Sequence, residues 1–287
     1  MQPLSPGALR IVHLSDSHLT GDGSLHQRVV DTTAALDLVL STAHAVPDVG
    51  LLVGSGDLSD DGSIASYRLL QNRLAEWADE RGAAIVVVPG NHDQRAGFAE
   101  VFGGDPAGPL DSVTTVDGWR VIGLDTSVPG RGYGLLRPAQ LDALRTELST
   151  PADRGTVVVL HHPPLDAPTT LHQALRLQNP HDLDELFEGS DVRVVLAGHY
   201  HHFFAGSLGD VPVVVAPGIA NDTDVTAPHG TERALRGSGF AVVDISAGGT
   251  VTVTTQRASA PGDGLEVFVL DAATVDAIAA AAGPSAD

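Results

Sequence analysis

Short apolar runs rich in valine, leucine and isoleucine recur along most of the chain and predict β-strands. Several of these runs are continuous rather than alternating, which is typical of strands that are buried on both faces. The predicted strands are Leu9–Leu14, Val49–Val53, Ala84–Val88, Trp119–Leu124, Thr156–Leu160, Val192–Leu196, Val211–Val215, Phe240–Ile245 and Val251–Thr255.

Helical patterns separate the earlier runs. Apolar residues recur at helical spacing in Val29–Ala45 and in Ser63–Arg81. Pro138 is suited to the first turn of a helix over Ala139–Leu148, and Asp182–Phe187 predicts a shorter helix. Alternating strands and helices indicate an α/β fold with parallel pairing in the first half.

Short strands replace the helical patterns between Gly198 and Thr255, which predicts a second, more antiparallel sheet. We therefore expect a four-layer αββα sandwich, with two mixed sheets flanked by helices. We expect one domain over residues 1–287, with a core at about 9–257 and a C-terminal extension at 258–287. The last five residues, 283–287, are expected to be disordered.

Composition narrows the classes of partner. The 287 residues include 36 acidic residues and 16 basic ones, all arginine, for a net charge of −20. This balance argues against nonspecific binding to nucleic acid and against docking on anionic lipid. Cysteine is absent, which excludes disulfides and thiolate ligands. No signal peptide or membrane span is recognisable, so a cytoplasmic location is the expectation.

Five polar motifs follow apolar runs, where an open α/β sheet presents its site. Alone, most of them are weak: Asp-x-His is more often an accident, and Gly-Asp is more often a turn. In this order and at strand ends, they favour a metal site with nitrogen and oxygen ligands. The motifs are Asp16-Ser-His18, Gly56-Asp57, Gly90-Asn91-His92-Asp93, His161-His162-Pro-Pro and Gly198-His199-Tyr-His201.

The five motifs together resemble the pattern of the calcineurin-like metallophosphoesterase superfamily. The resemblance implies a first metal held by Asp16, His18, Asp57 and His201, and a second held by Asp57, Asn91, His161 and His199. His162 is the alternative to His161, as its neighbour in sequence. Imidazole and carboxylate ligands suit Mn, Fe, Zn or Co. The resemblance favours two divalent or trivalent ions, Mn and/or Fe.

Three connecting stretches are similar to bacterial class III cyclic-nucleotide phosphodiesterases of the mycobacterial type: Val121–Gly130, His161–Pro164 and Ser190–His199. This resemblance implies hydrolysis of a small phosphodiester, such as a 3′,5′- or 2′,3′-cyclic nucleotide, by a metal-bound hydroxide. A homodimer is also implied. The alternatives are a glycerophosphodiesterase, a broad-specificity phosphatase or nuclease, and a metal scaffold without catalysis.

His92 belongs to neither ligand set, and the family pattern implies that it acts as general acid or stabilises the transition state. Asp93 has two open interpretations: it orients an imidazole or it caps a helix. Arg95 and Arg131 could reach a phosphate, although exposed positions are favoured. Among the histidines of the specificity loops, His202 is expected to line the pocket.

Overall fold

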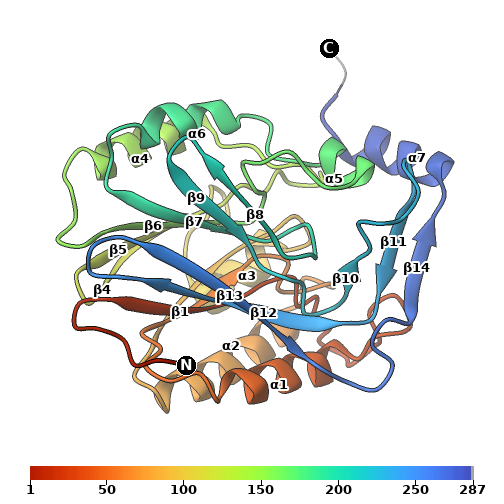
Figure 1. Ribbon diagram of the computed structural model, residues 1–287. Helices are drawn as coiled ribbons and strands as arrows, with labels where there is room; N and C mark the ends of the chain where they lie inside the picture. Colours follow the sequence, from red (N-terminus) through yellow and green to blue (C-terminus); the bar gives the residue numbers. More distant parts are fainter. Residues whose placement is uncertain (286–287) are drawn as a thin grey trace.

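Two β-sheets face each other at the centre of the computed structural model, which describes residues 1–285 (Figure 1). The first sheet has the order β13-β12-β1-β2-β3. Its parallel strands are β1 (Leu9–Leu14), β2 (Leu51–Ser55) and β3 (Ala84–Val88). Strand β12 (Ser238–Ile245) pairs antiparallel with β1, and β13 (Val251–Ala258) pairs antiparallel with β12.

The second sheet has the order β4-β5-β6-β7-β9-β8. Four neighbouring strands are parallel, with β4 and β8 antiparallel at the edges. The apolar residues between the sheets include Trp119, Val157 and Leu196 of this sheet and Ile11 and Val53 of the first. The strands are β4 (Ser112–Val116), β5 (Trp119–Leu124), β6 (Gly155–Leu160), β7 (Val192–Ala197), β8 (Phe204–Leu208) and β9 (Val211–Val215).

Helices cover the outer faces of both sheets. Helices α1 (Thr32–Ala43) and α2 (Ile64–Asp79) pack on the first sheet, and α3 (Arg95–Phe102) packs against α2. Helices α4 (Pro138–Leu148) and α6 (Pro180–Phe187) cover the second sheet. The resulting order of helix, sheet, sheet and helix confirms the predicted four-layer αββα sandwich (Figure 1).

A smaller group of elements lies at one side of the sandwich (Figure 1). It contains a three-stranded sheet with the order β10-β11-β14 and two helices that contact each other, α5 and α7. The sequence did not predict these elements, nor did it predict β4 and β8. Their bounds are Asp222–Thr223 for β10, Glu232–Leu235 for β11, Glu266–Leu270 for β14, Thr170–Ala174 for α5 and Ala272–Ala282 for α7.

The predicted origin of the second sheet was wrong in one respect. The strands predicted after Gly198 do not form a sheet of their own, because β9 extends the second sheet while β12 and β13 extend the first. Strand β12 is largely buried on both faces, so it gains more apolar burial beside β1 than at a new edge.

The expectations for a membrane span and for the C-terminal end can be compared with residues 1–285. No helix within residues 1–285 is long and apolar enough to span a membrane. The expectation for 283–287 falls partly on residues 286–287, which lie outside the described residues. The one-domain division stays a prediction.

Candidate metal centre

The seven predicted ligands come from loops that follow five strands of the two facing sheets. The loops after β1 and β2 carry Asp16, His18 and Asp57, and the loop after β3 carries Asn91. The loops after β6 and β7 carry the remaining histidines, namely His161, His199 and His201. The site therefore lies at the carboxyl ends of parallel strands, as the sequence predicted.

Four of the predicted ligands form a first group, in which all but His201 are buried. Single ligand atoms of Asp16, His18, Asp57 and His201 all lie within 4.8 Å of one another. Nε2 of His18 is 3.2 Å from Nε2 of His201 and 3.6 Å from Oδ2 of Asp57. Nε2 of His201 is 3.4 Å from Oδ1 of Asp16. Imidazole nitrogens facing each other beside two carboxylates need a proton or a cation between them, so this donor set fits a metal ion.

A second group shares Asp57 with the first. Nε2 of His161 lies 3.2 Å from Oδ1 of Asn91 and 3.4 Å from Oδ2 of Asp57. The ring of His199 packs against His161, and its Nε2 is buried without a hydrogen-bond partner among the described residues. A buried imidazole nitrogen needs a partner, and a metal ion would supply one here. The second donor set therefore also fits an ion.

The hydrogen bonds of His162 distinguish it from His161. The hydroxyl of Thr126 lies 2.8 Å from Nδ1 of His162, and the carbonyl oxygen of Gly132 lies 3.1 Å from its Nε2. Both ring nitrogens are thus occupied, one as acceptor and one as donor, in a neutral imidazole. Burial lowers the pKa of His162 to about 3, consistent with the neutral ring. Its contacts therefore leave no nitrogen for a metal.

Other contacts hold the ligands in place. Nδ1 of His161 donates to the carbonyl of Ser55 at 2.8 Å, which turns Nε2 toward the second group. The backbone amide of His199 donates to both carboxylate oxygens of Asp16, at 3.1 and 3.2 Å. Such outer contacts fix the tautomer and orientation of metal ligands.

The backbone at the ligands is unusual, because five of the seven have positive φ angles. The values are 53° for Asp16, 45° for His18, 49° for Asp57, 71° for His199 and 48° for His201. This left-handed region costs an ordinary residue about 1–2 kcal/mol. Such strain is concentrated at functional sites, where the surrounding structure enforces it. Here it turns successive side chains into one centre immediately after each strand.

Two glycines of the motifs allow the close packing of this backbone. A Cβ atom on Gly90 would lie 2.2 Å from Oδ1 of Asp57. Gly56 has a φ of +94°, and a Cβ atom there would lie 2.4 Å from Nδ1 of His161. Steric contact therefore requires glycine immediately before Asp57 and immediately before Asn91.

His92 remains available beside the two groups. Its backbone amide donates to Oδ1 of Asp57 at 2.8 Å, and its side chain is 44% exposed. The edge of its ring meets the ring of His18 at a centroid distance of 4.7 Å. The ring can therefore act on a bound molecule without serving as a ligand.

Asp60 is a residue of the centre that sequence reasoning missed. Its carboxylate lies 3.2 Å from Nδ1 of His18, 3.2 Å from Nδ1 of His26 and 3.7 Å from Nδ1 of His92. Burial opposes its charge, but the hydrogen bond with His18 and the close imidazole of His26 outweigh burial and hold the pKa of Asp60 well below its usual range. Its place three residues after Asp57, in the same loop, was the available signal.

Asp93 has neither of the roles considered for it. Its carboxylate accepts hydrogen bonds from the backbone amides of Leu58, Ser59 and Gly90, at 3.1, 3.0 and 2.8 Å. It contacts no imidazole by these bonds, and the N-cap of α3 is Gln94. Asp93 therefore joins the loop that carries Asp57 to the loop that carries Asn91, because three orphan amides need an acceptor there.

Two further expectations, for Arg95 and His202, are corrected by contacts elsewhere. Arg95 is largely buried, because Nη2 forms an ion pair with Oδ2 of Asp125 at 2.9 Å. Arg131 donates to the carbonyl of Ala281 in an exposed hydrogen bond. His202 pairs with Asp222 at 2.8 Å, outside the cavity beside the ligands. Position next to His201 in sequence does not decide this, since the chain turns between the two side chains.

An open cavity of about 240 Å³ lies beside the two ligand groups. His92 and ligands of both groups line it, and His26, Gln27 and His172 join them. Elements at the side of the sandwich supply an apolar part of the lining. The residues of this apolar wall are Leu171 and Leu175 from α5 and its end, Phe268 from β14 and Ile278 from α7.

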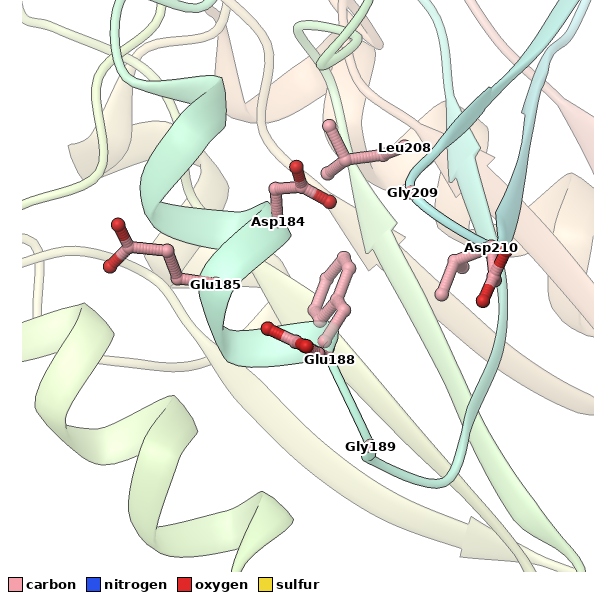
Figure 2. A pocket seen from close by; sticks show the side chains of 9 residues that line it. Asp184, Glu185, Glu188, Gly189, Leu208, Gly209 and Asp210 are labelled. Atoms are coloured by element: carbon pink, nitrogen blue, oxygen red, sulfur yellow. The ribbon is translucent and has the colours of Figure 1, made fainter.

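A second hollow lies between α6 and the β8–β9 turn (Figure 2). Carboxylates dominate its lining: Asp184, Glu185, Glu188 and Asp210. Figure 2 shows these side chains around an opening that would repel an anionic phosphoester. The cavity beside His92 is therefore the candidate substrate site.

Comparison with known proteins gives a consistent picture. The family model described as calcineurin-like phosphoesterase matches residues 9–203. A protein of Rhodococcus erythropolis named "Probable cyclic nucleotide phosphodiesterase" is 39% identical over 79% of this chain and 76% of its own length. A Mycobacterium tuberculosis protein named "cAMP/cGMP dual specificity phosphodiesterase" is 36% identical over 79% of this chain and 73% of its own.

A solved structure supports the fold alone. The purple acid phosphatase of yellow lupin superimposes with a TM-score of 0.62 at 15% identity, over 100% of this chain and 58% of that chain. The family match covers more than half of the chain and contains all five motifs. This protein belongs to the calcineurin-like phosphoesterase family.

Proposed function

We propose that this protein is a dinuclear-metal phosphodiesterase that hydrolyses small phosphodiesters, with cyclic nucleotides as its substrates. The observation that carries the proposal is the convergence of two donor groups that share Asp57, beside a cavity into which the free imidazole of His92 faces. The names of the Rhodococcus and Mycobacterium relatives support the substrate class.

The proposed ligands divide as the two groups do. Asp16, His18, Asp57 and His201 would hold the first ion, and Asp57, Asn91, His161 and His199 the second. Nitrogen and oxygen donors suit Mn, Fe, Zn or Co, and family membership favours Mn and/or Fe. When bound, the two ions would supply positive charge for the phosphoryl oxygens and a hydroxide nucleophile at neutral pH.

The chain's own residues would perform the remaining steps. His92 is within reach of the cavity and would donate a proton to the alkoxide that leaves phosphorus, an effect worth roughly 10²–10⁴-fold in rate. Asp60, 3.7 Å from Nδ1 of His92, would hold the ring in position for this step. Asn91 would contribute a ligand oxygen without adding negative charge near an anionic substrate.

The lining of the cavity favours diesters over monoesters. Among the described residues that line it there is no arginine, and the chain has no lysine. A monoester dianion needs more compensating charge than a diester monoanion does. The apolar wall of the cavity also suits the organic part of a small diester.

The proposal is tested with the full-length protein reconstituted with Mn²⁺. The substrates are bis-p-nitrophenyl phosphate, p-nitrophenyl phosphate, cyclic AMP and single-stranded DNA. We expect turnover of both diesters, with cyclic AMP preferred over the monoester and DNA. Absence of turnover of any diester would refute the enzymatic role, and preferential cleavage of DNA would refute the cyclic-nucleotide assignment.

Two histidines provide a matched pair of variants. His92→Ala should lower kcat by about 10²–10⁴-fold while the Mn content stays unchanged. His202→Ala removes an imidazole that pairs with Asp222 outside the cavity, so it should leave kcat unchanged. Equal effects of the two substitutions would contradict the proposed role of His92. Asn91→Ala should remove most activity and leave the fold intact.

A further inference from the structure

Glu232 is a buried carboxylate in the wall of the candidate substrate cavity. It lies in β11, and the residue is only 3% exposed. Its Oε2 has no hydrogen-bond partner among the described residues. Its Oε1 lies 3.9 Å from Nδ1 of His172, beyond hydrogen-bond distance. Nothing in the wall thus neutralises this carboxylate by direct contact.

The neighbouring cation is used elsewhere. Arg233, the next residue, forms its ion pair with Asp224. Burial raises the pKa of Glu232 to about 6, although the nearby hydroxyl of Thr169 offsets part of this effect. The carboxyl group is therefore mainly ionised at pH 7.5. Burying an unpaired charge is expensive, and a native protein that keeps one needs a reason for it.

Packing does not supply that reason. The alternating burial of β11 points Glu232 and Ala234 inward, and Glu232 pairs with Leu270 through the backbone only. An apolar side chain would fill the same position at lower cost. Glu232 lines the same cavity as the apolar wall already defined, and His172 is the imidazole beside its carboxylate.

We propose that Glu232 determines substrate specificity by accepting a hydrogen bond from an N–H or O–H group on the nucleoside part of the substrate, whose base packs against the apolar wall. The inference rests on the proposed function, because it assigns the part of the substrate beyond the phosphoryl group. Rotation about the last side-chain bond exchanges the two carboxylate oxygens, so one free acceptor is available. The donor is either an amino group of the base or the 2′-hydroxyl of the ribose.

Most of this subsite lies outside the family-matched segment 9–203. Strands β11 and β14 and helix α7 follow that segment, and Figure 1 shows them together with α5 at one side of the sandwich. The metal ligands would thus define the reaction, while this later part of the chain defines which alcohol is bound. That division explains why the acceptor is not part of any family motif.

Calorimetric binding to the Mn²⁺-loaded protein tests the proposal without requiring turnover. The ligands are 5′-AMP, 2′-deoxy-5′-AMP and purine riboside 5′-monophosphate, which lacks the amino group. The wild type should bind 5′-AMP about 10- to 100-fold more tightly than the analogue that lacks the donor in question. Glu232→Leu should bind all three equally, and Glu232→Gln should fall between.

Glu266 provides the control. It lies in β14, the strand paired with β11, and it is exposed. Glu266→Gln should bind the three ligands as the wild type does. Thermal unfolding adds a readout that separates function from structure: Glu232→Leu should unfold at the same or a higher temperature, because it removes an unpaired buried charge.

The outcomes separate the two proposals. Equal binding of the three ligands by the wild type overturns the role of Glu232, whether or not cyclic AMP is hydrolysed. A lower unfolding temperature of Glu232→Leu with unchanged ligand discrimination also overturns it and leaves a structural role. Discrimination that depends on Glu232 in a protein that hydrolyses no diester would support the subsite while refuting the proposed reaction.

Discussion

Replacing Asp60 with asparagine should weaken metal binding without removing any proposed ligand. One carboxylate contacts Nδ1 of His18 and Nδ1 of His26, both at 3.2 Å. An asparagine has a single carbonyl oxygen, so its amide group would face one of the two rings as a donor. The ring of His18 would then lose the charged acceptor that directs its Nε2 toward Asp57 and His201, or it would adopt the wrong tautomer.

The size of the effect follows from the kind of contact. Substituting an outer partner of a metal-ligating histidine costs 10- to 100-fold in metal affinity, or about 1.4–2.8 kcal/mol. Asp60 is 27% exposed, and the carbonyl of asparagine can still accept from one ring. We therefore expect the lower end, about tenfold, for Asp60→Asn.

The assay is Mn²⁺-dependent recovery of bis-p-nitrophenyl phosphate hydrolysis, with calorimetric titration in parallel. Asp61→Asn is the matched control, because Asp61 bonds to the amides of Gly21 and Ser63 and to Ser59 rather than to an imidazole. If Asp60 acts through His18, excess Mn²⁺ should restore kcat. An unchanged Mn²⁺ dependence in Asp60→Asn would refute this reasoning, and a loss that persists at saturation would assign the effect to His92 instead.

Three other predictions follow from the same contacts. Burial opposes the charge of His161, but the carboxylates around it, Asp57 first, raise its pKa to about 9, so the metal-free ring is protonated at neutral pH. Binding of Mn²⁺ should therefore release a proton at pH 7, and Mn²⁺ should bind more tightly as pH rises toward 9. Calorimetry in buffers of different ionisation enthalpy measures the proton release. Gly90→Ala should lower both the unfolding temperature and diesterase activity, since its Cβ would lie 2.2 Å from Asp57, and full activity would contradict the close approach. Arg95→Met should lower the free energy of unfolding by about 3–5 kcal/mol in chemical denaturation, because it leaves Asp125 buried and uncompensated, while Mn²⁺ affinity of the folded protein stays the same.

The ligand residues could be proposed from sequence because residue types that bind metals directly follow runs that predict strands. Asp16, Asp57 and His161 each follow an apolar strand, and parallel strands bring such residues to one edge. The family pattern added the pairing of ligands with ions. Asp60 was missed because a carboxylate that orients an imidazole needs no fixed spacing from it: the residue contacts His18 from another loop, 42 positions away.

The elements that sequence reasoning missed have weak signals for physical reasons. Strand β4 is exposed over most of its length, so it lacks an apolar run. Helix α7 is rich in alanine, which favours helices without marking a buried face; its start was nevertheless encoded, since Asp271 accepts from the amide of Thr274. The sheet that β12 joins depends on which sheet edge is free in the folded protein. The local sequence of β12 carries no information about that edge.

The contact between Asp16 and the amide of His199 joins positions 183 residues apart. Strand β1 also pairs with β12, which follows His199 in the sequence. At a synthesis rate of about 5–20 residues per second, roughly 9–37 seconds separate the synthesis of Asp16 from that of His199. A nascent chain that has passed the loop after β3 carries the two aspartates, His18 and Asn91 but none of the later histidines. The proposed centre would therefore assemble late in translation or after it, and metal would have to reach the chain after these segments are made. A truncated product ending before β7 would lack one of the four proposed ligands of each ion, His201 in the first set and His199 in the second, and we expect it to be inactive toward phosphoesters.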